Sequence, residues 1–364
     1  MIRPGAVRTV ARRLAQRVRP RPPASWRAIG ARPGRVVAFS EPDYLGVTRS
    51  TRSFFADWIP LRERDLWRPG DARGLAEAVA ASGCAAVVFS GFAPGYARAI
   101  EALGRRAPEL PVFVLWHGNV LQNTEECSWR HLGEVVALAR RGRIRRVGCF
   151  HAGLPALLER AGVSAAFVMN RPERIPARAS TPRGDGRIHL GIWSAGESWR
   201  KNPHATIGAA ALVERAVLSG LLDPRARAWA AMLGVTLGRV VDAPLPRERL
   251  EEELASAHCN LYVTLSECSP LLPLESLGVG APCLIGPNSH LFREEGEAAD
   301  ALRRALIVER VDEPADIAAA IRRVVAMREE VIAAYRVWAP EQERRARAAM
   351  EALLERKLEL PDAP

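Results

Sequence analysis

Residues 261–286 read LYVTLSECSPLLPLESLGVGAPCLIG. The opening apolar run predicts a buried strand that ends at Ser266. A loop of small residues follows, and a helix is expected to begin near Pro273. The backbone amides of such a loop, together with the positive end of the helix, form a site suited to a diphosphate. Two carboxylates frame this segment, Glu267 at the loop entrance and Glu275 in the first helical turn.

The same alternation of strand and helix extends in both directions from this segment. Short continuous apolar runs, typical of parallel strands buried on both faces, occur in the first half at Arg35–Ser40, Ala85–Ser90, Val112–Trp116, Val147–Phe150 and Ala165–Met169. The second half restarts with a strand at Ile188–Trp193 and a helix at Asn202–Leu218. We therefore expect an α/β protein with two Rossmann-like domains facing across a cleft and a C-terminal helical segment.

Composition and patterning predict five parts of the chain. Residues 170–186 are rich in proline and glycine, lack apolar periodicity and mark a linker. The predicted parts are a basic N-terminal arm over 1–34, a first Rossmann-like domain over 35–172, the linker over 173–187, a second Rossmann-like domain over 188–338, and a C-terminal helix over 339–364. We expect this last helix to pack back toward the first domain.

The net charge of +11 belongs to the arm, because residues 1–40 contain ten arginines and no acidic residue. Val7, Val10 and Leu14 recur at helical spacing, which predicts a short amphipathic helix. Attachment to an anionic membrane surface is one interpretation, and a solvated or partner-bound tail is the other. We expect no nucleic-acid binding, because no aromatic platform accompanies the arginines.

The remaining composition is that of a globular protein of the cytoplasm. Hydrophobic residues make up 48% of 364, yet no apolar run is long enough to span a bilayer, and the N-terminus lacks the apolar core of a secretory signal. The six cysteines are widely spaced without a CxxC pair, which favours buried thiols over a zinc site. No DxD sequence or histidine–cysteine cluster is evident, so we expect no protein-held metal.

Residues 261–286 resemble the donor-binding signature of retaining GT-B glycosyltransferases, especially those of family 4. The matching residues, in order, are Ser266, Glu267, Pro270, Leu274, Glu275, Gly280 and Pro282. The resemblance implies transfer of a sugar from a nucleoside-diphosphate sugar to an acceptor hydroxyl, with retention at the anomeric carbon and without a separate cofactor. The second domain would bind the donor, and the first would bind a glycan, lipid-linked or protein acceptor.

The resemblance also assigns roles to residues of the donor loop. Glu267 would face the hydroxyls of the donor sugar, and Glu275 would accept hydrogen bonds from both ribose hydroxyls. The backbone of Ser269, Pro270, Leu271 and Leu272 would hold the sugar and the diphosphate.

Three further positions complete the expected site. Lys201 and Asn202 match a basic segment that neutralises the diphosphate, but the family's upstream arginine falls on Gly196, so Arg200 is the candidate to replace it. Pro246 stands where relatives place a loop against the base. His117 follows a strand at the position where relatives keep a histidine near the reacting sugar, although a capping or packing role fits it equally.

Two other functions stay open from the sequence. The missing arginine, and an acceptor loop in which only Gly46 matches, are also expected of a catalytically impaired glycosyltransferase-like protein that acts as a binding or assembly partner. An epimerase of the same architecture would need a further set of acidic and basic residues that the sequence does not display. The expected location is cytoplasmic. The membrane-binding interpretation of the arm would place the protein at the inner face of the membrane.

Overall fold

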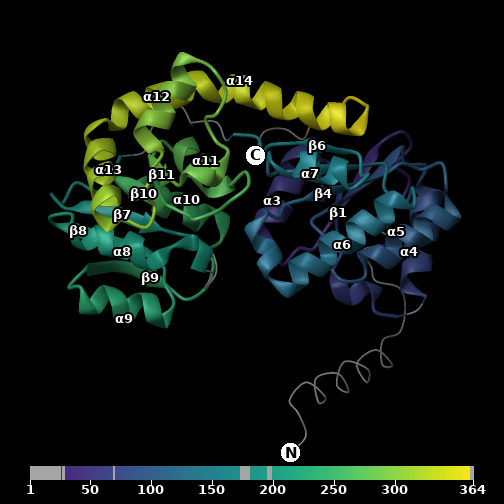
Figure 1. Cartoon of the computed structure of the whole chain (residues 1–364), viewed down its shortest axis with the longest axis horizontal. Helices are drawn as coiled ribbons and strands as arrows, with labels where there is room; N and C mark the ends of the chain where they lie inside the picture. The colour runs from purple at the N-terminus through teal and green to yellow at the C-terminus, as the bar shows by residue number, and fades with distance from the viewer. Residues whose placement is uncertain (1–25, 27–28, 69, 173–180, 195–198, 361–364) are drawn as a thin grey trace, which may run out of the picture. The chain divides into compact units, whose positions relative to one another are not determined.

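The computed structural model describes Trp26 and residues 29–68, 70–172, 181–194 and 199–360. Two compact units make up the chain, and both alternate strands with helices as predicted (Figure 1). The N-terminal unit runs up to Val168 and also includes the chain from Ala349 onwards. The C-terminal unit runs from Met169 to Ala348.

The N-terminal unit has a parallel sheet whose order among the described residues is β2-β1-β3-β4-β5-β6. Its strands are β1 (Val36–Ser40), β2 (Trp58–Pro60), β3 (Ala86–Ser90), β4 (Val112–Trp116), β5 (Arg146–Cys149) and β6 (Ala165–Phe167). Its helices are α3 (Leu45–Phe54), α4 (Asp71–Ser82), α5 (Tyr96–Arg106), α6 (Glu126–Arg140) and α7 (Leu154–Arg160), of which α4, α5 and α6 pack in series (Figure 1).

The C-terminal unit has a second parallel sheet, in the order β11-β10-β7-β8-β9. Its strands are β7 (Ile188–Ile192), β8 (Ala216–Leu221), β9 (Thr236–Val241), β10 (Cys259–Tyr262) and β11 (Cys283–Ile285). Its helices are α8 (Pro203–Ala211), α9 (Pro224–Met232), α10 (Arg247–Ser256), α11 (Leu271–Gly278), α12 (Glu297–Leu306), α13 (Pro314–Ala326) and most of α14 (Arg328–Leu354). The strand order reverses between β7 and β10, and the crevice at such a point is where doubly wound sheets bind ligands.

Local sequence explains these elements. The strands VVAFS, AVVFS and VFVLW combine β-branched and aromatic residues and are almost wholly buried, which favours extended backbone. Helices α8 and α9 both begin with proline, whose fixed φ suits the first helical turn. Asp223 caps α9 by accepting a hydrogen bond from the Ala226 amide at 2.7 Å.

The structure departs from the expected elements in three places. The helix expected over Asn202–Leu218 is wrong in its second half, because α8 ends at Ala211 and the apolar run that follows forms β8. The short strand β2 was not expected. The N-terminal unit also begins before residue 35, since Trp26 and Ile29 are buried in its core.

Parts of the predicted layout fall outside the described residues. They include the amphipathic helix of the arm, residues 173–180 of the linker and the Gly196 position. Among the residues that are described, no helix is both long enough and apolar enough to cross a membrane.

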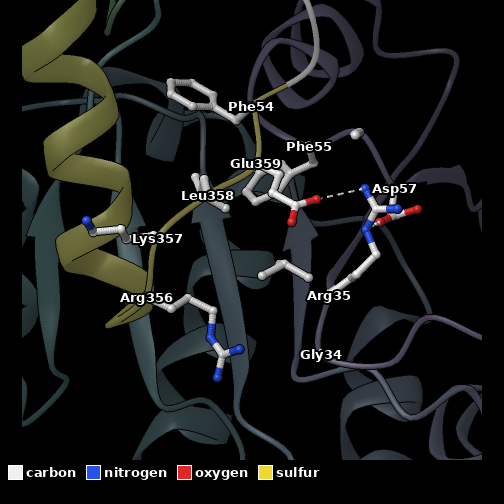
Figure 2. Close-up of a pocket in the computed structure, with 11 residues that line it drawn as sticks. Gly34, Arg35, Phe54, Phe55, Asp57, Arg356, Lys357, Leu358 and Glu359 are labelled. Carbon is white, nitrogen blue, oxygen red and sulfur yellow. Dashed lines mark ion pairs between the residues drawn. The ribbon is translucent and has the colours of Figure 1, made fainter.

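The end of the chain completes the N-terminal unit. Met350, Leu353 and Leu354 are buried, and the Leu353 side chain lies where a Cβ on Gly148 of β5 would collide with it. Farther on, the chain lines a small cavity of about 80 Å³ (Figure 2). There the Arg35 guanidinium pairs with Asp57 at 2.7 Å and with Glu359 at 3.3 Å.

Leu353→Ala should therefore destabilise the N-terminal unit. Deleting a fully buried leucine side chain costs about 2.7–5 kcal/mol, because apolar contact is lost and a cavity remains. Val337 lies in the same helix but is 71% exposed, so Val337→Ala is a control that should change stability by less than ~0.5 kcal/mol. Urea unfolding followed by tryptophan fluorescence measures both variants, and equal effects would contradict the packing described for residues 349–360.

Candidate functional site

The carboxyl ends of β7 and β10 meet at the switch point of the C-terminal sheet. After β7 the chain reaches α8 through a short 3-10 turn, Trp199–Lys201, and after β10 it reaches α11 through residues 263–270. A backbone hydrogen bond from the Leu265 amide to the Arg200 carbonyl, 2.9 Å long, joins the two loops. Side chains from distant parts of the sequence therefore converge here.

Asn202 fixes the course of the first loop. Its backbone is left-handed, with φ of 53°, a conformation that asparagine adopts more readily than most residues. Its side-chain amide donates to the carbonyls of Val263, at 3.2 Å, and of Val311. Its own carbonyl accepts a hydrogen bond from the Thr206 hydroxyl at 2.8 Å. The residue next to Lys201 is thus tied to three other segments of the unit.

Lys201 and Glu267, both predicted from the sequence, form an ion pair in which Glu267 is buried and Lys201 is partly buried. The Lys201 Nζ donates to Glu267 Oε1 and also to the Tyr262 hydroxyl, at 2.6 Å. The same Nζ lies 4.7 Å from the centre of the Tyr262 ring. Glu267 is only 7% exposed, so solvent screens this pair weakly. A buried pair is stable only when further hydrogen bonds satisfy both ions, and Tyr262 supplies one of them.

Arg200 places a second cation beside the same carboxylate. Its side chain is buried, and Nη1 lies 3.8 Å from Glu267 Oε1. Arg200, Lys201 and Glu267 together carry two positive charges and one negative charge. Where little water is present, cations attract an anionic ligand more strongly than they would in bulk solvent.

Tyr262 is a member of the site that the sequence analysis missed. Burial raises the pKa of Tyr262 well above its usual value, and the charge of Glu267, to which the hydroxyl is also hydrogen-bonded, raises it further. The hydroxyl therefore stays protonated at neutral pH. In the sequence this residue appears only as the last position of a buried strand, CNLY. The signal that points to it is its place at the carboxyl end of a strand beside the switch point.

The predicted donor loop leads directly into α11. The helix begins at Leu271, after Pro270 in extended backbone, two residues earlier than expected. The Ser269 hydroxyl accepts a hydrogen bond from the Asn170 amide at 3.0 Å, and the Ser269 carbonyl accepts one from the Asn170 side chain. Ser269 and Pro270 are buried, whereas Leu271 and Leu272 are partly exposed. The loop is therefore held in place from within its own unit.

Glu275 lies in α11 and is 4% exposed. The structure places Lys201 and Arg200 against Glu267 and puts Ser269 and Glu275 on the segment that follows Glu267. Among the described residues, no group of three or more histidine, cysteine, aspartate and glutamate side chains is arranged to hold a metal ion.

A cavity of about 550 Å³ opens at the carboxyl ends of β7, β8 and β9. Lys201 is part of its wall, so the buried ion pair borders this space. Other polar side chains of the wall are Ser194, Asp223, Arg227 and Asp242. Pro244 lines the cavity, whereas Pro246 is exposed at the start of α10, two residues farther along the same loop. Glu267 and Glu275 are not part of the lining.

His117 belongs to the N-terminal unit, where it follows β4. Its Nε2 lies 3.0 Å from the Ser90 hydroxyl, which in turn is 2.7 Å from the Thr51 hydroxyl. The ring stacks on Phe150 with 4.2 Å between centroids, and burial lowers the pKa of His117 to about 3. His117 is therefore a neutral imidazole at physiological pH. The neighbouring His151 accepts a hydrogen bond from the Gly153 amide at 3.2 Å through its Nδ1.

The His117 ring should not titrate between pH 8 and pH 5. Because its pKa in the folded state is lowered below the usual 6.5, the stability from this group is present above pH 6.5 and is lost as the pH falls from there toward 3. Imidazole nitrogen shifts in NMR spectra, assigned with His117→Gln, measure the titration directly. A midpoint near 6.5 would show that the ring is solvated.

Comparison with known proteins extends the description of the fold. No protein-family model matches the sequence, and no curated protein sequence matches it. Solved structures do match. The α,α-trehalose-phosphate synthase (UDP-forming) of Burkholderia vietnamiensis has a TM-score of 0.55 and 11% sequence identity, over 88% of this chain and 99% of that one.

Two other structures give the same result. Sucrose-phosphate synthase of Thermosynechococcus elongatus has a TM-score of 0.54 and 14% identity, over 88% of this chain and 96% of that one. The E. coli trehalose-6-phosphate protein bound with UDP-2-fluoro glucose has a TM-score of 0.56 and 12% identity, over 85% and 82% of the two chains. The chain therefore has the two-unit, Rossmann-like fold of GT-B glycosyltransferases, as the resemblance at residues 261–286 predicts.

Proposed function

We propose that this protein is a glycosyltransferase that moves a sugar from a nucleoside-diphosphate sugar to an acceptor hydroxyl, with retention at the anomeric carbon. The observation that carries the proposal is the buried cluster of Lys201, Arg200 and Glu267 at the switch point of the C-terminal sheet, beside a cavity of about 550 Å³. Two of the structures with this fold are described as a UDP-forming synthase and as a protein bound with UDP-2-fluoro glucose, which supports a nucleotide-sugar donor.

The chemistry follows from the charge of the cluster. Breaking the bond between the sugar and the diphosphate leaves positive charge on the sugar ring and negative charge on the departing phosphate. Cations already fixed in a water-poor site stabilise that negative charge without having to reorganise. Lys201 and Arg200 would do this, helped by the backbone amides of the Ser269–Leu272 segment and by the positive end of α11. The reaction would require no protein-held metal.

The other residues complete the donor site in this proposal. Glu275 would accept hydrogen bonds from the ribose hydroxyls, and Pro246, with the neighbouring Pro244 of the cavity wall, would lie against the base. Glu267 would orient the sugar and serve as the counter-ion of Lys201 when the donor is absent. The neutral His117 could donate or accept one hydrogen bond at the reacting sugar, but it could not supply a positive charge there.

The acceptor is a glycan, a lipid-linked glycan or a protein, and its site belongs to the N-terminal unit in this proposal.

The proposal also includes a cytoplasmic location and attachment to an anionic membrane through the arginine-rich arm. The attachment rests on the sequence of residues 1–34. The alternative is a catalytically impaired protein that acts as a binding or assembly partner. It rests on the glycine at position 196 and on an acceptor loop in which only Gly46 matches. Hydrolysis or transfer of a nucleotide sugar by the purified protein would exclude that alternative.

The ribose role of Glu275 can be tested by nucleotide binding. UDP, GDP, ADP and their sugar derivatives are first compared by thermal shift, because a ligand at 100 times its dissociation constant stabilises by ~2.7 kcal/mol. For the best ligand, Glu275→Ala should weaken binding by about 1.5–3 kcal/mol, since a charged acceptor of two hydroxyls is lost. Glu252→Ala removes an exposed carboxylate from α10 and should have no effect. Equal affinity of parent and Glu275→Ala would refute the assignment.

The role of the two cations can be tested by single-turnover transfer at saturating donor. Lys201→Ala and Arg200→Ala should each slow transfer, typically by ~100- to 1000-fold for the loss of one such donor in a dry site. Lys201 should matter more, because it alone matches the family position. The double variant should lose less than the two effects combined if both cations act on one phosphate.

Lys357→Ala is the matched control, because Lys357 is exposed and belongs to the N-terminal unit. Thermal unfolding of each variant checks that the loss of Lys201 from its ion pair has not unfolded the protein. Near-parent turnover by Lys201→Ala would rule out catalysis by stabilisation of the diphosphate at this segment.

A further inference from the structure

Lysine is exceptional in this chain. Of its 52 lysine and arginine residues, only Lys201 and Lys357 are lysines. Every other lysine or arginine position except 357 holds an arginine, yet the residue whose side chain contacts both Glu267 and Tyr262 is a lysine. An ammonium is a compact charge with three N–H donors, whereas a guanidinium is a wide planar fork. The contacts around Lys201 therefore call for a small cation held at one point.

Fixing a lysine side chain in one position costs more conformational freedom per hydrogen bond than fixing an arginine side chain, whose planar fork is pre-organised. The four-carbon stem of lysine is flexible, so an ammonium in a binding site stays in one position only where neighbouring groups hold it. Two such groups are present. Lys201 Nζ donates to Glu267 Oε1 and to the Tyr262 hydroxyl at 2.6 Å, and the two acceptors are themselves hydrogen-bonded to each other.

The two acceptors differ in what they do to the charge. Glu267 neutralises the ammonium, while Tyr262 anchors it without adding negative charge, because its hydroxyl stays protonated. A second carboxylate in place of Tyr262 would add another negative charge beside the ammonium. Without the Tyr262 hydroxyl as a second acceptor, the ammonium could occupy several positions around the Glu267 carboxylate. Two of the three N–H groups are thus engaged, and Lys201 also forms part of the wall of the adjoining cavity.

We infer that Tyr262 is a positioning residue, whose hydroxyl holds the Lys201 ammonium at the wall of the cavity so that it can bind the phosphate of an anionic ligand. This inference rests on the proposed function for the nature of the ligand, a diphosphate. Tyr262 itself need not touch that ligand. The competing explanation is that its ring packs in the core and its hydroxyl is incidental, since Tyr262 also belongs to the hydrophobic core of the C-terminal unit.

The first test needs no ligand. Protein labelled with ¹⁵N-lysine has two ammonium groups, one partly buried and hydrogen-bonded at Lys201 and one exposed at Lys357. The Lys201 signal should be visible because its protons exchange slowly. Tyr262→Phe, which keeps the ring, should broaden or abolish that signal, and Glu267→Gln should act in the same direction. An unchanged Lys201 signal in Tyr262→Phe would overturn the inference.

The second test uses inorganic pyrophosphate as the probe, titrated calorimetrically into the full chain. Tyr262→Phe should weaken its binding roughly tenfold, about the value of one hydrogen bond to a charged group. In a Lys201→Met background the same substitution should change binding less than ~2-fold, because Tyr262 acts through the ammonium. Tyr96→Phe is the control, since it removes a buried hydroxyl that donates to the Leu61 carbonyl at 2.8 Å in the other unit.

A core-packing tyrosine would give a different pattern. Tyr262→Phe would then lower thermal stability as Tyr96→Phe does, with pyrophosphate affinity unchanged or reduced equally in both Lys201 backgrounds. Either result overturns the inference, and so does failure of the parent to bind pyrophosphate. Absence of sugar transfer, with the lysine signal and the binding cycle as expected, would contradict the proposed function and leave the role of Tyr262 intact.

Discussion

The parallel pairing of strands is the constraint on which the rest of the molecule depends. A parallel strand can be reached only by a crossover, so every strand of a sheet ends at the same edge and delivers its following loop there. In the C-terminal unit this brings Lys201, after β7, to Glu267, after β10, although they are 66 residues apart in the sequence. In the order β9-β8-β7-β10-β11, the connections that follow β7 and β10 lead in opposite directions along the sheet. Their divergence leaves a space between the two loops at that edge.

Removing the two charges of this ion pair from water costs desolvation free energy. A contribution to folding stability therefore does not explain why the pair is present. Replacing a buried pair with apolar side chains is often neutral or stabilising, whereas removing one partner typically costs ~3–5 kcal/mol. Here the pair lies beside Arg200, whose Nη1 is 3.8 Å from Glu267 Oε1, and beside the neutral hydroxyl of Tyr262. A site for a diphosphate needs cations fixed in this way, because they stabilise the negative charge of the ligand.

Much of this architecture could be predicted from the sequence. Continuous apolar runs identify central parallel strands, and the segment 261–286 predicts both the donor loop and the resemblance that the solved structures confirm at the level of fold. Predictions from the local sequence pattern are wrong where tertiary contacts determine the secondary structure. Ala216–Leu221 continues a helical run of apolar residues and becomes a strand only because β7 and β9 flank it. Tyr262 looks like any buried aromatic residue until Lys201 is placed next to its hydroxyl.

The return of residues 349–360 to the N-terminal unit has a consequence for synthesis. During translation the first 168 residues emerge well before the segment that supplies Met350, Leu353 and Leu358 to their core. Domains usually fold in order as they leave the ribosome. Here the part of the core where Leu353 packs beside Gly148 stays incomplete until residues 349–358 have been made. The unit that is translated first is therefore the last to be finished.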